Sequence, residues 1–79
     1  MSMARYYFDT NNGTTTIPDK VGLELDGLEA ARMAAVSALP DMVKDTLWSG
    51  TPPRCVVWAR DEGGQCLLAV TLTLRVEVL

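Results

Sequence analysis

The chain of 79 residues contains no histidine. Histidine is the commonest general acid or base and the commonest metal ligand, and it activates the serine or cysteine of most nucleophilic hydrolases. Its absence excludes the Ser-His and Cys-His catalytic pairs. We therefore expect no catalytic residues, no metal site and no cofactor, and a protein that is not an enzyme.

Cysteine is scarce as well, with only Cys55 and Cys66. Two thiols without histidine are too few for a four-ligand zinc site within one chain. We expect the two residues on different strands of one hairpin, separated by more than the Cα–Cα limit of about 7 Å for a disulfide. Both are predicted to be buried free thiols.

Basic residues are few and scattered: seven Lys and Arg stand against ten Asp and Glu, for a net charge of −3. A protein that binds a nucleic-acid backbone needs clustered cations, so nucleic acid is not an expected partner. Acidic residues gather before and within the start of a predicted helix, at Asp19, Glu24, Asp26 and Glu29. We interpret them as solvent-exposed charges favoured by the helix dipole.

Long apolar runs are also missing. No stretch approaches the roughly 18 apolar residues that a membrane span needs, and we recognise no cationic and apolar leader. We therefore expect a cytoplasmic protein without membrane contact. Hydrophobic residues make up 48% of the chain, which suits one globular domain, 1–79, whose small core favours oligomerisation.

The first predicted hairpin lies near the start of the chain. Residues 5–10 are rich in aromatic side chains and 14–17 contain three consecutive threonines, and both compositions favour extended backbone. Asn12-Gly13 between them is typical of a two-residue type I′ turn. That turn would set Phe8 opposite Ile17.

One helix is predicted in the middle of the chain. A connector, 19–25, precedes it and is expected to be extended, with its odd-numbered side chains facing the core. Asp26 and Glu29 have the spacing of a capping box, and Pro40 predicts a kink or a break near Leu39. Apolar residues recur at helical spacing on one face, at Leu28, Ala31, Ala35, Leu39, Met42, Val43 and Leu47.

Two β-rich runs, 54–60 and 66–78, predict a second hairpin around a glycine-containing turn. A wider loop than Gly63-Gly64 would shift its register by one residue. The predicted fold is α+β: an antiparallel sheet of two hairpins, in the order β-β-α-β-β, with one kinked amphipathic helix packed on one face. With Gly63-Gly64 as the turn, the facing pairs are Ala59–Leu68, Val57–Val70 and Cys55–Leu72, while Cys66 faces Asp61.

The last predicted strand alternates apolar and other residues from 66 to 78, about twice the reach of its hairpin partner. Segment 73–79 must therefore pair with the first hairpin or with a second copy of the chain, because an exposed apolar edge invites association. Large aromatic residues concentrate binding energy, so at least one of Trp48 and Trp58 is a candidate anchor. We predict a homodimer whose interface residues are Leu72, Leu74, Val76, Val78 and Trp58.

Four motifs in combination resemble one protein family: Arg5-Tyr6-Tyr7-Phe8-Asp9, Asp19-x-x-Gly22-x-Glu24-Leu25, Leu28-Glu29-Ala30-Ala31-Arg32 and Arg60-Asp61-Glu62-x-Gly64. The family comprises short alphaproteobacterial proteins known only as a domain of unknown function. The resemblance covers nearly the whole chain and implies a bacterial α+β domain, with no activity or catalytic residue to transfer. Pro40 departs from the unbroken helix of that family.

Two functions are compatible with these observations. The first is a small non-enzymatic interaction domain that self-associates through its last strand and has an unidentified protein as a further partner. The alternative is a regulatory or antitoxin-like domain that binds a protein toxin or nucleic acid. Segment 18–39 is similar in outline to antitoxin domains, but the DNA-binding segment that such antitoxins often carry has no counterpart here.

Overall fold

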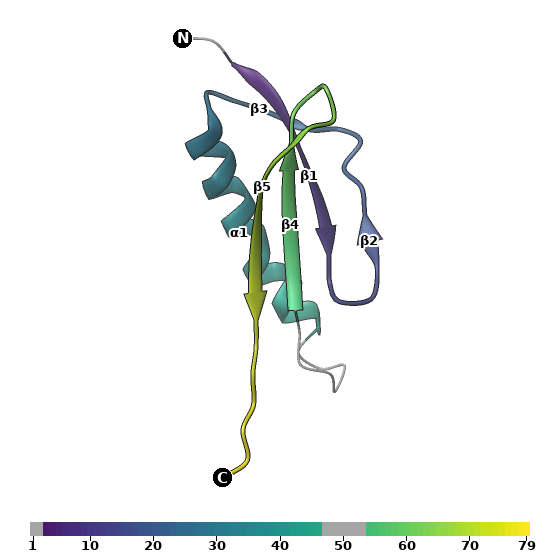
Figure 1. Cartoon of the computed structure of the whole chain (residues 1–79), viewed down its shortest axis with the longest axis vertical. Coiled ribbons are helices and arrows are strands. Elements are labelled where there is room, and N and C mark those ends of the chain that lie inside the picture. The colour runs from purple at the N-terminus through teal and green to yellow at the C-terminus, as the bar shows by residue number, and fades with distance from the viewer. Residues whose placement is uncertain (1–2, 47–53) are drawn as a thin grey trace.

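The computed structural model describes residues 3–46 and 54–79, and within them one helix packs against a five-stranded sheet (Figure 1). The predicted α+β class is confirmed, although a third short strand precedes the helix. Leu47, Trp48 and the predicted loop 49–53 lie outside the described residues. In chain order the elements are β1 (Ala4–Asn11), β2 (Thr16–Ile17), β3 (Leu23–Leu25), α1 (Leu28–Thr46), β4 (Arg54–Arg60) and β5 (Cys66–Thr73).

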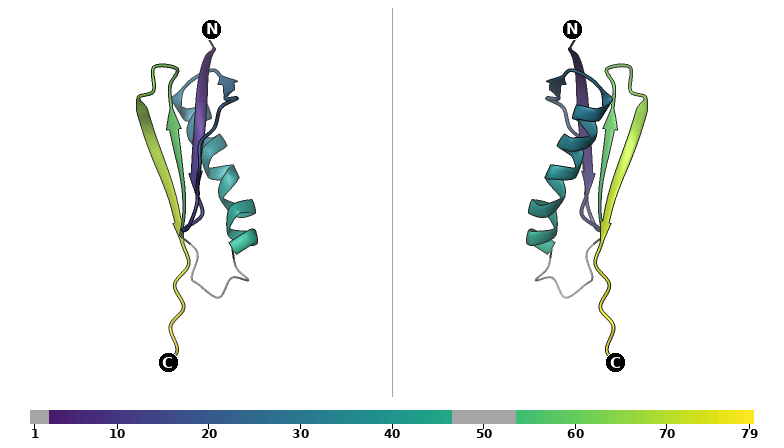
Figure 2. Two further views of the ribbon diagram at one scale, coloured as in Figure 1. Left: turned by 90° about the vertical axis from the view of Figure 1, so that its right-hand side faces the viewer. Right: turned by 90° about the vertical axis from the view of Figure 1, so that its left-hand side faces the viewer.

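The sheet is antiparallel, with the order β2-β1-β4-β5, and β3 pairs with the first residues of β1. Figure 2 shows α1 on one side of this sheet. We call that side the helix face, and the other side, which no described element covers, the open face. β5 forms one edge of the sheet.

The second hairpin has the predicted register. Ala59 pairs with Leu68, Val57 with Val70 and Cys55 with Leu72. Its turn is wider than predicted, because the Gly64 N–H donates to the Asp61 carbonyl at 3.0 Å and Gly64 adopts a φ of 88°. This is the turn-plus-glycine-bulge form of hairpin, and it sets Cys66 opposite Arg60 rather than opposite Asp61.

The predicted register of the first hairpin is wrong. Thr10, not Phe8, lies opposite Ile17. The reason is that Asn12 does not occupy a two-residue turn: its Oδ1 accepts the N–H groups of Thr14 and Thr15 at 3.1 and 2.9 Å. These side-chain bonds stabilise a four-residue loop in place of the type I′ turn.

The connector before the helix also differs from its prediction. Leu23–Leu25 is a strand, β3, but among the apolar residues of the connector Val21 and Leu23 are exposed and only Leu25 is half-buried. The expectation that the odd-numbered side chains face the core is therefore wrong. Residues 19–22 form a turn instead of extended backbone, so the alternation of faces does not begin where the sequence pattern does.

The helix runs without interruption from Leu28 to Thr46, with Pro40 inside it. The predicted break near Leu39 is wrong, and the kink stays a prediction. Pro40 is exposed, while Leu39 on the preceding position is buried in the core, so packing holds the helix together across the proline.

The start of the helix does not form the predicted capping box. The Ala31 N–H donates to the Gly27 carbonyl at 3.1 Å, which makes Gly27 the N-cap and places Asp26 one residue earlier. Glu29 uses both carboxylate oxygens to bind Arg32 instead of reaching back along the chain.

The core lies between α1 and the helix face and is built from small side chains. Its largest fully buried side chains are those of Val57 and Cys55. Leu28, predicted on the buried face, is exposed at the helix start. Phe8, Met42, Val43, Leu68 and Val70 pack around the core while partly exposed. The buried hydrophobic residues are Tyr6, Ala31, Ala35, Leu39, Cys55, Val57 and Ala59.

Candidate interaction surface

β5 presents an open edge, because among the described strands it pairs only with β4. Its free edge carries backbone N–H and C=O groups that another strand can bind. The predicted alternative, in which 73–79 pairs with the first hairpin, is wrong: β4 occupies the position beside β1. The strand is also shorter than predicted and ends at Thr73.

Beyond β5 the chain continues out of the sheet as a segment that we call the arm, residues 74–79 (Figure 1). Every arm residue is exposed. Arg75 and Glu77, two positions apart, form an ion pair of 2.6 Å, so the odd-numbered side chains share one side of the arm. The even-numbered apolar side chains therefore occupy the other side.

The structure brings four of the five predicted interface residues into one line, which we call the edge row. Leu72 belongs to the helix face of β5, because it pairs with the buried Cys55, and the alternation continues this face into the arm. All four members are exposed, by 42% for Leu72, 41% for Leu74, 70% for Val76 and 97% for Val78.

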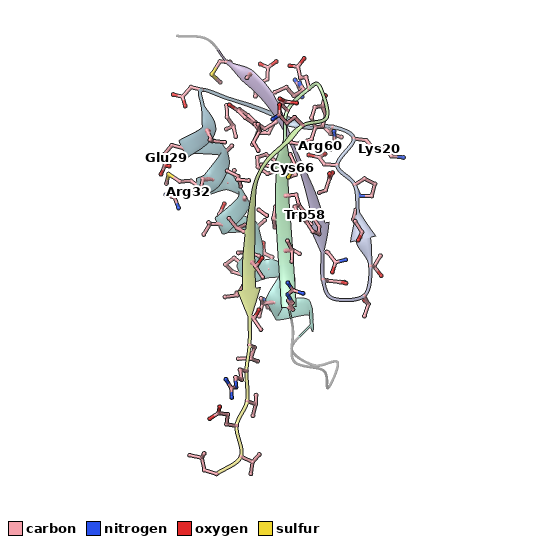
Figure 3. The ribbon with its side chains drawn as sticks, viewed as in Figure 1. Lys20, Glu29, Arg32, Trp58, Arg60 and Cys66 are labelled. Atoms are coloured by element: carbon pink, nitrogen blue, oxygen red, sulfur yellow. The ribbon has the colours of Figure 1, made fainter. Side chains whose placement is uncertain are left out.

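Trp58, the fifth predicted interface residue, does not belong to the edge row. It lies in β4 between Asp9 of β1 and Ala69 of β5 (Figure 3). Its neighbours in β4, Val57 and Ala59, are buried on the helix face, so Trp58 is on the open face, where it is half-buried. The predicted set therefore divides between two surfaces.

A further apolar surface on α1 was not predicted. Met33 and Val36 are exposed, although the helix has an adequate buried face without them. Figure 3 places Glu29 and Arg32 on the side of α1 that points away from β1 and β4, and Val36 lies one turn after Arg32 on the same side. The two apolar residues Met33 and Val36, three positions apart and so neighbours on the helix surface, are the signal in the sequence that could have indicated this second row.

A polar cluster holds the turn at 19–22 against β1 and β4. Asp9 binds Arg60 Nε through Oδ2 at 2.8 Å and accepts the Asp19 N–H through Oδ1 at 2.8 Å. Arg60 Nη2 also donates to the Asp19 carbonyl at 2.7 Å, and its guanidinium lies 4.7 Å from the centre of the Tyr7 ring. Three of the four sequence motifs meet here.

Asp19 is the centre of this cluster. Its Oδ2 accepts the Phe8 N–H at 3.0 Å, and its Oδ1 accepts the N–H groups of Val21 and Gly22 at 2.9 and 3.1 Å. Asp19 is half-buried, so its predicted role as a solvent-exposed charge near the helix is wrong. Glu24 binds Arg5 at 3.3 Å, and it remains exposed as predicted.

The electrostatics follow these contacts. The hydrogen bond from Arg60 lowers the pKa of Asp9, and the same bond raises the pKa of Arg60. Burial raises the pKa of Asp19, but the N–H groups of Phe8, Gly22 and Val21 outweigh it, and the pKa lies below the ordinary value. Both carboxylates are therefore charged at neutral pH and engaged in holding the turn.

The two cysteines are free, as predicted, and Cys55 is buried. Cys66 is exposed, against the prediction, because the glycine bulge places it at the beginning of an edge strand. Among the described residues, no three His, Cys, Asp or Glu side chains gather as metal ligands would.

Within residues 3–46 and 54–79, no helix has both the length and the apolar character that a bilayer crossing requires. Comparisons with curated proteins and with solved structures find no match. A family model does match, over residues 5–73, which includes all the strands and the helix apart from the first residue of β1. The chain therefore belongs to DUF6894, a family defined as a domain of unknown function.

Proposed function

We propose that this protein is a small, non-enzymatic interaction domain that forms a homodimer through β5 and the arm. The observation that carries the proposal is the edge row, in which one exposed apolar side chain on the edge strand β5 is followed by three on the arm that continues it. A strand edge offers backbone hydrogen bonds, and the alternating side chains supply apolar contact on one face.

The apolar contact available to a dimer is of the same size as the cost of association. Fully burying a Val or Leu side chain contributes about 1.5–3 kcal/mol relative to leaving it in water. Eight edge-row side chains in a dimer, even half-buried, contribute on the order of 10 kcal/mol, against an association cost of roughly 4–15 kcal/mol. Strand pairing adds backbone hydrogen bonds to this balance.

The small core points in the same direction. The largest fully buried side chains are a valine and a cysteine, while Met33, Val36 and the whole edge row remain in water. A domain of this size buries a modest fraction of its surface and gains stability from a partner subunit. A second copy supplies an apolar surface that matches the first by symmetry.

The test is light scattering on a size-exclusion column, run as a dilution series. The wild-type chain should elute as a dimer, and Val76→Lys should elute as a monomer, because a lysine in the edge row would be buried without a counter-charge. Val21→Lys is the matched control: Val21 is as exposed as Val76 but lies in the turn at 19–22. A wild-type monomer at tens of micromolar would contradict the proposal.

A further inference from the structure

Symmetry restricts how two copies of β5 can pair. When a two-fold axis relates two antiparallel strands that pair with each other, the axis is perpendicular to the sheet. Both helices then lie on the same face of the combined sheet. Residues directly opposite each other in a sheet share a face, and even-numbered residues of β5 lie on the helix face. Even-numbered residues must therefore pair with even-numbered residues of the partner.

Several pairings satisfy this condition, and the one that matches the apolar side chains best has its axis at Thr73, so that Thr73 lies opposite Thr73 of the partner subunit. It sets the whole arm beside the free edge of the partner's β5. On the open face it sets Leu79 opposite the partner's Leu67 and pairs the threonines at the axis, a favourable cross-strand pair. On the helix face the pairs are Leu74 with the partner's Leu72, Val76 with the partner's Val70, and Val78 with the partner's Leu68.

The neighbouring registers are worse. An axis at Leu74 pairs only residues 69–79 and leaves Leu67 and Leu68 of both copies outside the paired segment. An axis at Arg75 places two arginines opposite each other, and like charges in that position are destabilising. An axis at Val76 pairs Arg75 with the partner's Glu77, but it joins arm to arm and leaves the edge of both β5 strands unpaired. An axis at Leu72 sets Leu79 opposite the partner's turn residue Gln65 and Leu67 opposite a glutamate.

The position of α1 supports the axis at Thr73. In Figure 1 the first turns of α1 extend past β5, on the side away from β4. An arm that lies along β5 on the outside would pass beside this part of the partner's helix. Its helix-face side chains, Val76 and Val78, would then meet the flank of α1 that carries Glu29, Arg32 and the exposed Val36.

We infer that two copies pair β5 antiparallel to β5 about an axis at Thr73, and that each arm lies between the edge of the partner's β5 and the partner's α1. This inference rests on the proposed homodimer and identifies the second copy as the occupant of the edge row and of the apolar surface at Val36. The product is one continuous antiparallel sheet with both helices on one face.

Disulfide trapping tests the register. In a Cys66→Ala background, which removes the exposed native thiol, Thr73→Cys should form an inter-chain disulfide under mild oxidation, because residues opposite each other lie about 4.5–5.5 Å apart at Cα. Leu72→Cys and Val76→Cys are the comparison variants. In the inferred register the Cα atoms of the two copies of residue 72 lie about 8 Å apart, and those of residue 76 lie about 20 Å apart. Both distances exceed the limit for a disulfide.

A second variant tests the contact with α1. Val36→Asp should shift the dimer dissociation constant upward by at least tenfold while circular dichroism shows an unchanged fold, since Val36 is exposed in one chain. Ser37 is the next residue of the helix and is also exposed, so Ser37→Asp serves as the control. Its dimer dissociation constant should stay within twofold of the wild-type value.

The outcomes separate the two proposals. A wild-type monomer in light scattering overturns the homodimer and this inference together. A wild-type dimer in which Val76→Cys or Leu72→Cys is trapped and Thr73→Cys is not overturns the register alone. A dimer that Val36→Asp leaves unchanged overturns the placement of the arm against α1.

Discussion

Gly22 shows how one residue joins the polar cluster to the sheet. Its φ is 76°, in the left-handed region, and a Cβ at this position would lie 2.9 Å from both Arg5 Cγ and Tyr7 Cε2 and 3.1 Å from the Tyr6 carbonyl oxygen. No other residue type satisfies both the backbone angle and the space.

Gly22→Ala is therefore expected to lower the free energy of unfolding by about 2–4 kcal/mol, from the left-handed backbone and the overlap together. Gly63→Ala is the control, since its φ is not positive and its nearest contact is 3.4 Å. Urea denaturation followed by circular dichroism measures both. A loss below about 1 kcal/mol for Gly22→Ala would show that the turn relaxes without cost.

The carboxylates of the same cluster predict the response to acid. The pKa of Asp9 and that of Asp19 lie below 3.8 in the folded chain, so the unfolded chain binds more protons as the pH falls. The stability that these groups contribute is complete above about pH 5 and is lost as the pH falls through 3.8 and then through the lower folded values.

The expected measurement is a melting temperature that is level from pH 8 to about pH 5 and decreases below about pH 4. Asp9→Asn should be less stable at pH 7, because it removes the charged partner of Arg60, and should lose less stability on acidification. If the melting temperature of Asp9→Asn decreases on acidification as much as that of the wild type, the loss of stability in acid does not come from Asp9.

At the scale of elements, the two hairpins differ in how far they follow from sequence. The register of β4 with β5 follows from its apolar alternation, because a slip of one residue would expose Val57 and Leu68 to water. The register of β1 with β2 does not, because side-chain oxygens of two asparagines bind the loop backbone. Local hydrogen bonds outweigh the intrinsic preference of Asn-Gly for a type I′ turn.

The helix is a second case in which packing decides. Pro40 lacks the N–H that a helix interior uses, and proline costs about 3 kcal/mol there relative to alanine. The helix nevertheless continues across it, since buried Leu39 and the half-buried residues of the next turn pack on the sheet.

Pro40→Ala should therefore raise the free energy of unfolding by about 1–2 kcal/mol, after the added freedom of the unfolded chain is subtracted. Ser37→Ala, on the same exposed side of α1, should change it by less than about 0.5 kcal/mol. Thermal and urea denaturation measure both variants. A Pro40→Ala variant less stable than the wild type would mean that the proline fits its site better than alanine.

At the scale of the whole molecule, dimerisation makes stability depend on concentration. If folding and association are coupled, the melting temperature should rise when the protein concentration is raised, because mass action favours the associated state. A chain truncated after Thr73 lacks three of the four edge-row residues and should melt at one temperature across the same range. Calorimetry over a hundredfold dilution makes the comparison, and a wild-type melting temperature independent of concentration would contradict it.

The sequence by itself determined the fold class, the buried face of α1 and the register of the second hairpin, because each depends on a local period of apolar residues. It also brought Leu72, Leu74, Val76 and Val78 onto one row. Only the tertiary structure decided that β4 takes the place beside β1 and leaves β5 at the edge. The polar cluster of Asp9, Asp19 and Arg60 likewise joins residues far apart in the chain, through contacts that have no period and so leave no pattern in the sequence.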